Sequence, residues 1–354
     1  MPLIDSERLS HSIKIVIACI IGIIVTQLFA TFAHFPQSPW ILISIIVVMC
    51  GQMFVGSVVQ RSYWRFLGTI TGCLFAMVAL MAFGHSDVTA AIIIGLSTFI
   101  FSYIAVTDER LSYACTLGAA TTAIIMLDQH PTLLLASQRF IEISSGVLIA
   151  GITSQFILPI HARTHLRRTQ AKTLRQLRDY YVACMVTRSM DTETLHYEEL
   201  EENIIKSLLK QRQLAKESAN EPFGPFFDPL HFMQSLQCER EMLRAINLMH
   251  QAMSQIKTAE QFIHSDALRD FNDAVLQSLD KLILYISHIA NAAAMQTLPA
   301  FPLQALRDTV RKDIATLSQQ ESIHIDGFLF ASDMLVTFLL RLATLGAQTA
   351  KNTQ

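Results

Sequence analysis

Long charge-free stretches dominate the first half of this chain. Five of them contain no Asp, Glu, Lys or Arg: residues 15–60, 66–86, 88–107, 111–127 and 143–162. A helix that crosses the hydrocarbon core of a bilayer needs roughly 17 to 25 apolar residues. Backbone polar groups cannot remain unpaired in lipid, so apolar stretches of this length have to be helical. These stretches therefore predict a polytopic membrane domain.

The charged residues are concentrated in the second half. Residues 1–160 hold 6 of the 27 Lys and Arg residues and 7 of the 29 Asp and Glu residues. With 51% hydrophobic residues and a mean hydropathy of +0.38, the chain is more apolar than a typical soluble domain. We expect an all-α protein with a transmembrane domain at 1–160 and a cytoplasmic all-helical domain at 161–354. The net charge of −2 indicates no nucleic-acid partner.

The first charge-free stretch is long enough for two spans, and Pro36 and Pro39 in the segment HFPQSP mark the break between them. Together with the other stretches this predicts six transmembrane helices, at residues 13–33, 39–59, 65–84, 88–106, 110–127 and 139–159.

The orientation follows from the distribution of basic residues between the loops. Basic residues flank the spans on one side, and Arg139 is the exception on the other side. The first group comprises Arg8, Lys14, Arg61, Arg65, Arg110, Arg163, Arg167, Arg168 and Lys172. Because cytoplasmic loops carry the excess of Lys and Arg, both termini are expected in the cytoplasm of a bacterial inner membrane.

The polar half reads as a bundle of helices. Helical periodicity continues from the last span past residue 180 and then covers roughly 193–218, 229–257, 260–293, 303–320 and 326–347. The segments EPFGPFFDP and LPAFP break the pattern. The last helix is apolar, but Asp333 and Arg341 interrupt it, so we expect a buried or interface helix rather than a seventh span.

The sequence contains no pattern that indicates catalysis or a cofactor. GxSxG, Walker A and HExxH motifs are missing, as is a GxGxxG that opens a strand–helix unit. The 6 cysteines are scattered without metal-ligand spacing. We therefore expect neither an enzyme nor a cofactor or metal site.

Two arginines are the main candidates for substrate contact. Arg61 and Arg65 are spaced i and i+4, so they project from one face of a helix near the inner interface. They either anchor the helix end at the membrane surface or form an electropositive mouth that gathers small organic anions. Thr69 follows one turn after Arg65 and is a candidate wall residue of the same pathway.

Small and polar residues near these arginines have packing and pathway interpretations. Gly68 and Gly72 form a small-xxx-small face that allows a neighbouring helix to approach closely. Gln27 and Gln52 lie in the first two predicted spans and need hydrogen-bond partners in lipid, either on another helix or on a substrate. Gln52 is the pathway candidate.

Trp40 and Glu142 lie near the outer ends of predicted spans. Trp40 is at the usual place of a belt tryptophan and could also stack on an aromatic ligand. Glu142 follows Arg139 by three residues, so the two either form a structural pair or Glu142 couples transport to protons.

The segment from Trp40 to Gly72 resembles the fusaric acid resistance and aromatic acid exporter family of membrane transporters. The resemblance rests on Pro39-Trp40, then Gly51 and Gly56, then the segment RSYWRFLGTITG at residues 61–72. Its arginine, glycine and threonine positions, which are Arg65, Gly68, Thr69 and Gly72, match the family's R-x-x-G-T-x-x-G entry to a span. The plan of six spans followed by a helical region is similar to that of short members. Plant organic-anion channels are similar in plan but more distant.

The resemblance implies export of aromatic carboxylic acids or similar organic anions by a secondary transporter, with a periplasmic adaptor as a possible partner. Longer relatives carry two membrane units, and this chain has one, which favours a homodimer. Two other functions remain open: an organic-anion channel, and a non-transporting scaffold or sensor that acts through the cytoplasmic bundle.

Overall fold

The computed structural model describes residues 6–32, 38–84, 86–108, 111–128, 131–187, 194–223, 227–255, 264–287, 298–313 and 319–352. In this part of the chain the regular structure is helical, with no strand. The chain divides into two compact units. Unit 1 comprises residues 1–162 and 220–223, and unit 2 comprises residues 163–219 and 224–354.

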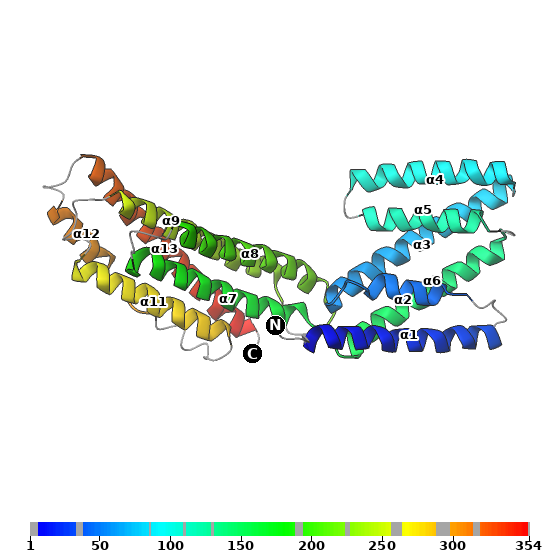
Figure 1. Ribbon diagram of the computed structural model, residues 1–354, viewed down its shortest axis with the longest axis horizontal. Helices are drawn as coiled ribbons and strands as arrows, with labels where there is room; N and C mark the ends of the chain where they lie inside the picture. The colour runs from blue at the N-terminus through cyan, green and yellow to red at the C-terminus, as the bar shows by residue number, and fades with distance from the viewer. Residues whose placement is uncertain are drawn as a thin grey trace. The chain divides into compact units, whose positions relative to one another are not determined.

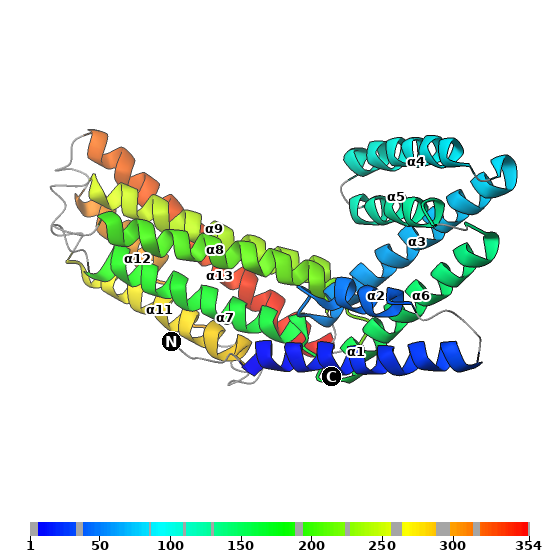
Figure 2. The ribbon, with the colours of Figure 1, turned by 45° about the vertical axis from the view of Figure 1, so that its right-hand side comes forward.

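Unit 1 contains α1 to α6 (Figure 1). Their bounds are α1 Ser6–Phe32, α2 Trp40–Met49, α3 Val55–Phe83, α4 Asp87–Thr107, α5 Ser112–Met126 and α6 Leu133–Phe156. Helix α3 packs against α5 and α6, and α4 lies beside α5, as Figure 2 also shows. Helix α2 packs mainly against α6 and α1. Pro36 and Arg110 lie outside the described residues.

Helix α2 is only 10 residues long, about half of what a bilayer requires. It ends at Met49, and Gly51 follows with φ of +88°, a left-handed conformation that glycine adopts readily. Helix α3 then begins at Val55. The predicted span 39–59 is therefore wrong in its second half, and the predicted start of the next span at residue 65 is too late. The break lies in uncharged sequence, where a search for charge-free stretches cannot detect it.

Helix α2 packs closely against α1 and α6. A Cβ atom added to Gly22 of α1 would meet the side chain of Ile45, and one added to Gly146 of α6 would meet Ile41 and Ser44. Ile41, Ile45 and Ser44 are almost fully buried. Small residues on α1 and α6 thus allow α2 to lie deep in unit 1.

Five described helical segments are long and apolar enough to cross a membrane. They are Ser6–Phe32, Val55–Phe83, Asp87–Thr107, Leu133–Phe156 and Ser322–Gln348. The first four belong to unit 1 and make it a multi-pass membrane domain. Helices α2 and α5 are apolar but shorter, so six full-length spans are not confirmed.

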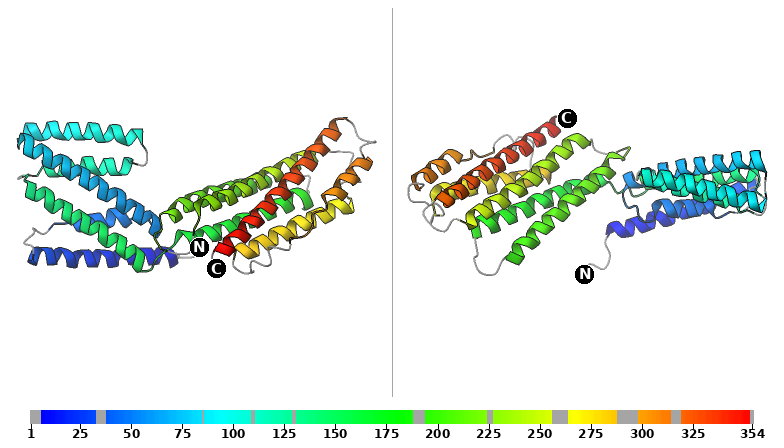
Figure 3. Two further views of the ribbon diagram at one scale, coloured as in Figure 1. Left: turned by 180° about the vertical axis from the view of Figure 1, so that it is seen from behind. Right: turned by 90° about the horizontal axis from the view of Figure 1, so that it is seen from above.

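Unit 2 consists of long helices that lie lengthwise beside one another (Figure 3). Their bounds are α7 Ala162–Tyr181, η1 Val182–Thr187, α8 Thr194–Ala219, α9 Pro229–Ser254, α11 Asp266–Ile286, α12 Leu303–Asp313 and α13 Gln319–Asn352. The predicted starts of helices at 193, 229 and 303 agree with these bounds within one residue. Asp228 caps α9 by accepting hydrogen bonds from the backbone N–H groups of Leu230 and His231.

Helix α13 contains the fifth of the long apolar segments. It packs mainly against α9, and half of its most apolar window is buried. Asp333 lies on its exposed side and forms an ion pair with Arg307 at 3.4 Å. This burial agrees with the expectation of a helix that packs within the bundle.

Candidate anion-binding site

Arg65 is a buried cation with a neutral partner. It lies in the third turn of α3, and its side chain is 5% exposed. Its Nη2 atom donates a hydrogen bond to Oγ of Ser44 on α2 at 3.2 Å. In the described part of the chain its Nε atom has no hydrogen-bond partner and no carboxylate pairs with it. Burial of an unbalanced charge is costly, so this guanidinium is suited to receive an anion.

Arg61 lies one turn earlier and adds a second cation. Its guanidinium carbon lies 4.9 Å from the ring centroid of Tyr113 on α5, and Tyr113 is also a neighbour of Arg65. Both arginines belong to the interior of α3 and not to a loop between spans, because α3 begins at Val55. The sequence did not indicate Ser44 or Tyr113 as their partners.

Lys14 is a further buried cation, which the sequence analysis assigned to the flank of the first span. It lies within α1 and is 1% exposed, and its Nζ atom has no hydrogen-bond partner among the described residues. The buried residues of α1 are Lys14, Ala18 and Gly22. A spacing of four places them on one face of the helix. The alignment of Lys14 with two small residues is therefore the sequence signal that could have identified it as a buried residue.

Arg139 and Glu142 form an ion pair, which was one of the two interpretations of their spacing. Nη1 of Arg139 donates to Oε2 of Glu142 at 2.9 Å and to Oγ of Ser38 at 2.8 Å. Ser38 also donates to the same Glu142 oxygen at 2.9 Å. The guanidinium lies 5.4 Å from the ring centroid of Trp40, and Asp128 is 3.8 Å away. Glu142 is 3% exposed, and because α6 begins at Leu133 it lies deeper in its helix than the predicted span placed it.

Helix α2 brings these two groups close together. Trp40 contacts Arg139, and Ser44 contacts Arg65. Residues 40 and 44 lie on one face of α2, separated by one turn, a rise of about 6 Å. The uncompensated Arg65 and the compensated Arg139 are therefore neighbours along the same short helix.

The other predicted pathway residues have different surroundings. Thr69 is buried, and its hydroxyl donates to the backbone oxygen of Arg65 at 2.9 Å, within α3. Gln52 does not lie in a span as expected. It lies in the break between α2 and α3, where its backbone N–H donates a hydrogen bond to the backbone oxygen of Met49 at 3.0 Å. Among the described residues, neither side chain forms a hydrogen bond with the Arg65 guanidinium.

Gly68 and Gly72 lie at the contact between α3 and α5. An added Cβ would meet the backbone oxygen of Ala114 at Gly68 and that of Gly118 at Gly72. Thr122 of α5 donates a hydrogen bond to the backbone oxygen of Gly72 at 3.1 Å. Close approach of the two helices holds Arg65 and Tyr113 within one side-chain length of each other.

The chemistry of this region favours a carboxylate ligand. The cations at residues 14, 61 and 65 of unit 1 have no ion-pair partner among the described residues, whereas Arg139 is neutralised by Glu142. A guanidinium can bind a carboxylate with two parallel hydrogen bonds. No group of three potential metal ligands occurs in the described part of the chain.

Comparisons with known proteins agree with this description. Residues 23–152 match the family described as fusaric acid resistance protein-like. The inner membrane protein YeeA of Escherichia coli (strain K12) is 25% identical over 174 residues, which are 49% of this chain and 47% of that protein. The p-hydroxybenzoic acid efflux pump subunit AaeB of Escherichia coli O9:H4 (strain HS) is 26% identical over 158 residues, 41% of this chain and 23% of that protein. The matches thus span less than half of either relative.

Proposed function

We propose that this chain, which is a membrane protein of the fusaric acid resistance protein-like family through residues 23–152, exports small organic anions of the aromatic carboxylic acid class from the cytoplasm. The observation that carries the proposal is the buried Arg65 guanidinium, whose partner among the described residues is a hydroxyl and not a carboxylate. The similarity to a p-hydroxybenzoic acid efflux pump subunit supports an aromatic acid as substrate.

In this mechanism Arg65 receives the carboxylate of the substrate, Arg61 raises the positive potential beside it, and Lys14 adds a further buried positive charge to unit 1. Arg139 of α6, whose guanidinium lies beside Trp40, one turn from Ser44 on α2, then offers a second position. In the structure this guanidinium forms an ion pair with the carboxylate of Glu142. Protonation of Glu142 would weaken this ion pair and free Arg139 for the substrate, so that proton entry and substrate release are coupled.

The membrane potential also favours export of an anion. With the cytoplasm at −100 mV, expulsion of one negative charge gains about 2.3 kcal/mol. We further propose a bacterial inner-membrane location with both termini in the cytoplasm, a homodimer as the working unit, and cooperation with a periplasmic adaptor.

The experiment that tests this function is flux of labelled carboxylates through the purified chain in liposomes. Aromatic and aliphatic acids are compared under imposed pH and voltage gradients. We expect saturable flux of aromatic acids in wild type and at least about a tenfold loss in Arg65→Ala, since one charge-assisted hydrogen bond contributes about 1.5 to 3 kcal/mol. Arg269→Ala, which removes an exposed arginine of unit 2, is the matched control and keeps the flux.

A fold defect is distinguished from a transport defect by thermal unfolding in detergent. Arg65→Met removes the buried charge and keeps an apolar side chain of similar length, so its midpoint should not fall, and lost flux with intact stability in this variant assigns the residue to transport. Equal flux in wild type and Arg65→Ala contradicts the proposal and leaves Arg65 with a packing role.

Glu142→Gln separates a coupled exporter from an anion channel. An exporter that uses this carboxylate loses its dependence on the pH gradient in the variant. A channel gives current that scales with voltage without saturation and is indifferent to the substitution.

A further inference from the structure

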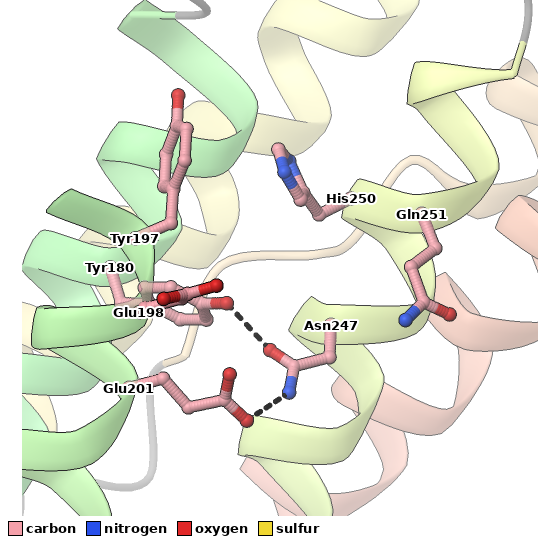
Figure 4. Close-up of a pocket in the computed structure, with 7 residues that line it drawn as sticks. All are labelled: Tyr180, Tyr197, Glu198, Glu201, Asn247, His250 and Gln251. Carbon is pink, nitrogen blue, oxygen red and sulfur yellow. Dashed lines mark hydrogen bonds between the residues drawn. The ribbon is translucent and has the colours of Figure 1, made fainter. Parts of the chain in front are cut away.

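Unit 2 contains a cavity that the transport mechanism does not use. Its volume is about 290 Å³, near the lower end of the range for small-ligand pockets. It lies between α8 and α9 beside the end of α7, and Figure 4 shows the side chains around it. The lining residues are Tyr180, Tyr197, Glu198, Glu201, Asn247, His250 and Gln251.

The charged groups of the lining are acidic. Glu198 and Glu201 project from one side of α8, and neither Lys nor Arg lines the cavity. Among the described residues, no hydrogen bond or ion pair engages the Glu198 carboxylate. An anionic ligand is therefore disfavoured, and a cation would be attracted.

A hydrogen-bond chain fixes one wall. The Tyr180 hydroxyl donates to Oδ1 of Asn247 at 2.8 Å, and Nδ2 of Asn247 donates to Oε1 of Glu201 at 2.6 Å (Figure 4). Burial raises the pKa of Tyr180, so its hydroxyl remains a donor. The chain holds one oxygen of Glu201 in place and orients the carboxylate at the cavity.

The opposite wall is aromatic. The rings of Tyr197 on α8 and His250 on α9 lie 4.8 Å apart with an angle of 44° between their planes. Tyr197 is also tied to η1, since its hydroxyl donates to the oxygen of Ala183 at 3.3 Å. Such π-helical turns are frequent beside functional sites, and aromatic faces attract organic cations and their alkyl groups.

We propose that this cavity binds a small organic cation of the alkylammonium class. The ammonium group lies against the carboxylates of Glu198 and Glu201, and the alkyl part lies against the rings of Tyr197 and His250. A metal ion is the weaker alternative, because the two glutamates and the histidine do not form a group that could hold one within the described residues. A bound cation would connect α8 to α9.

Isothermal titration calorimetry on the full chain in detergent tests the proposal. The probes are butylammonium and 1,4-diaminobutane, with butyrate and butanol as anionic and neutral compounds of similar length. We expect saturable binding of the two amines, weakened by added salt, and no binding of the other two compounds. Binding of butyrate or butanol equal to that of the amines would overturn the assignment.

Matched variants localise the binding. Glu198→Gln and Glu201→Gln are each expected to weaken amine binding about tenfold, since each removes one charge-assisted contact. Glu199→Gln makes the same charge change at an exposed neighbour outside the lining and keeps wild-type affinity. Unchanged affinity in both cavity variants contradicts the proposal, as does the absence of amine binding to the wild-type chain. A thermal unfolding midpoint within wild-type range confirms that each variant is folded.

Discussion

Among the described residues, three buried side chains carry or can carry a charge without an ion-pair partner. Arg65 and Lys14 lie in unit 1, and Glu239 lies in unit 2 with no exposed surface. Charges in such positions destabilise a fold unless a partner offsets them. Each of these positions is therefore a candidate for a function that stability alone does not require.

Replacement of Lys14 should separate function from stability. In Lys14→Met the apolar side chain has a similar length and no buried charge. We expect a higher thermal unfolding midpoint, equivalent to about 1 to 3 kcal/mol, together with a several-fold higher KM for the exported acid. Arg8→Met, on the exposed surface of the same helix, serves as control and should change neither quantity. A lower midpoint in Lys14→Met would mean that the ammonium has a stabilising partner.

Glu239 predicts a pH dependence of stability. Burial raises the pKa of its carboxyl to about 8 from an ordinary value of 4.5, although hydrogen bonds from Gln211 and Gln170 oppose the shift. The folded chain therefore binds a proton that the unfolded chain releases between pH 4.5 and 8. The neutral carboxyl can donate to Oε1 of Gln211 after an amide flip, an atom that has no hydrogen-bond partner in the described part of unit 2.

The resulting slope can be measured by chemical unfolding. Stability falls by about 1.4 kcal/mol per pH unit as pH rises through this window, because ionisation is penalised only in the folded state. Glu239→Gln should remove the slope and be more stable than wild type at pH 8. Glu241→Gln, two residues along α9 and paired with Arg244, should retain the wild-type slope. If the free energy of unfolding of Glu239→Gln changed with pH as steeply as that of wild type, Glu239 would not be the source of the slope.

At the scale of elements, the contact between α3 and α5 depends on the absence of side chains. Gly72 lies so close to α5 that an added Cβ would meet backbone and Thr121 atoms, which cannot move away as a flexible side chain can. The two helices would have to separate, and this would also displace Arg65 relative to Tyr113.

Gly72→Ala is therefore expected to destabilise the membrane unit by about 1 to 3 kcal/mol, the usual cost of overpacking, and to reduce flux. Gly95→Ala in α4 is the matched control, because nothing lies within 4 Å of the added Cβ. There the substitution should be neutral or slightly stabilising, since alanine favours helix more than glycine does. The measurement is the thermal unfolding midpoint of each variant in the same detergent. Equal midpoints for Gly72→Ala and Gly95→Ala would exclude close packing at Gly72.

At the scale of the whole molecule, we predict a homodimer. Light scattering coupled to size-exclusion chromatography, corrected for bound detergent, should give a protein mass twice the 39.7 kDa of the chain. Since a dimer dissociates on dilution, flux per chain should fall when liposomes hold on average less than one dimer. A monomer mass together with undiminished flux at that dilution would contradict the dimer.

Helix locations in unit 2 could be predicted well because local signals define them. Proline and glycine segments end the periodic pattern before α9, and Pro229 begins that helix directly after its cap residue Asp228. The membrane segments were recognised from composition, but the break at Gly51 was missed. A left-handed glycine in uncharged sequence changes neither hydropathy nor charge, and its conformation depends on how α2 packs against α1 and α6.

The sequence by itself determined the helical class and the apolar and polar halves, because these follow from composition and periodicity. It offered the pairing of Arg139 with Glu142 as one of two interpretations of residues three apart. Only the tertiary structure decided that Lys14 and Arg65 are buried, and that Ser44 and not a carboxylate faces Arg65. These properties depend on side chains from three helices. Nothing in their sequence positions indicates which of them pack together. The energy of a buried charge depends on that surrounding set, and therefore on the packing of the helices.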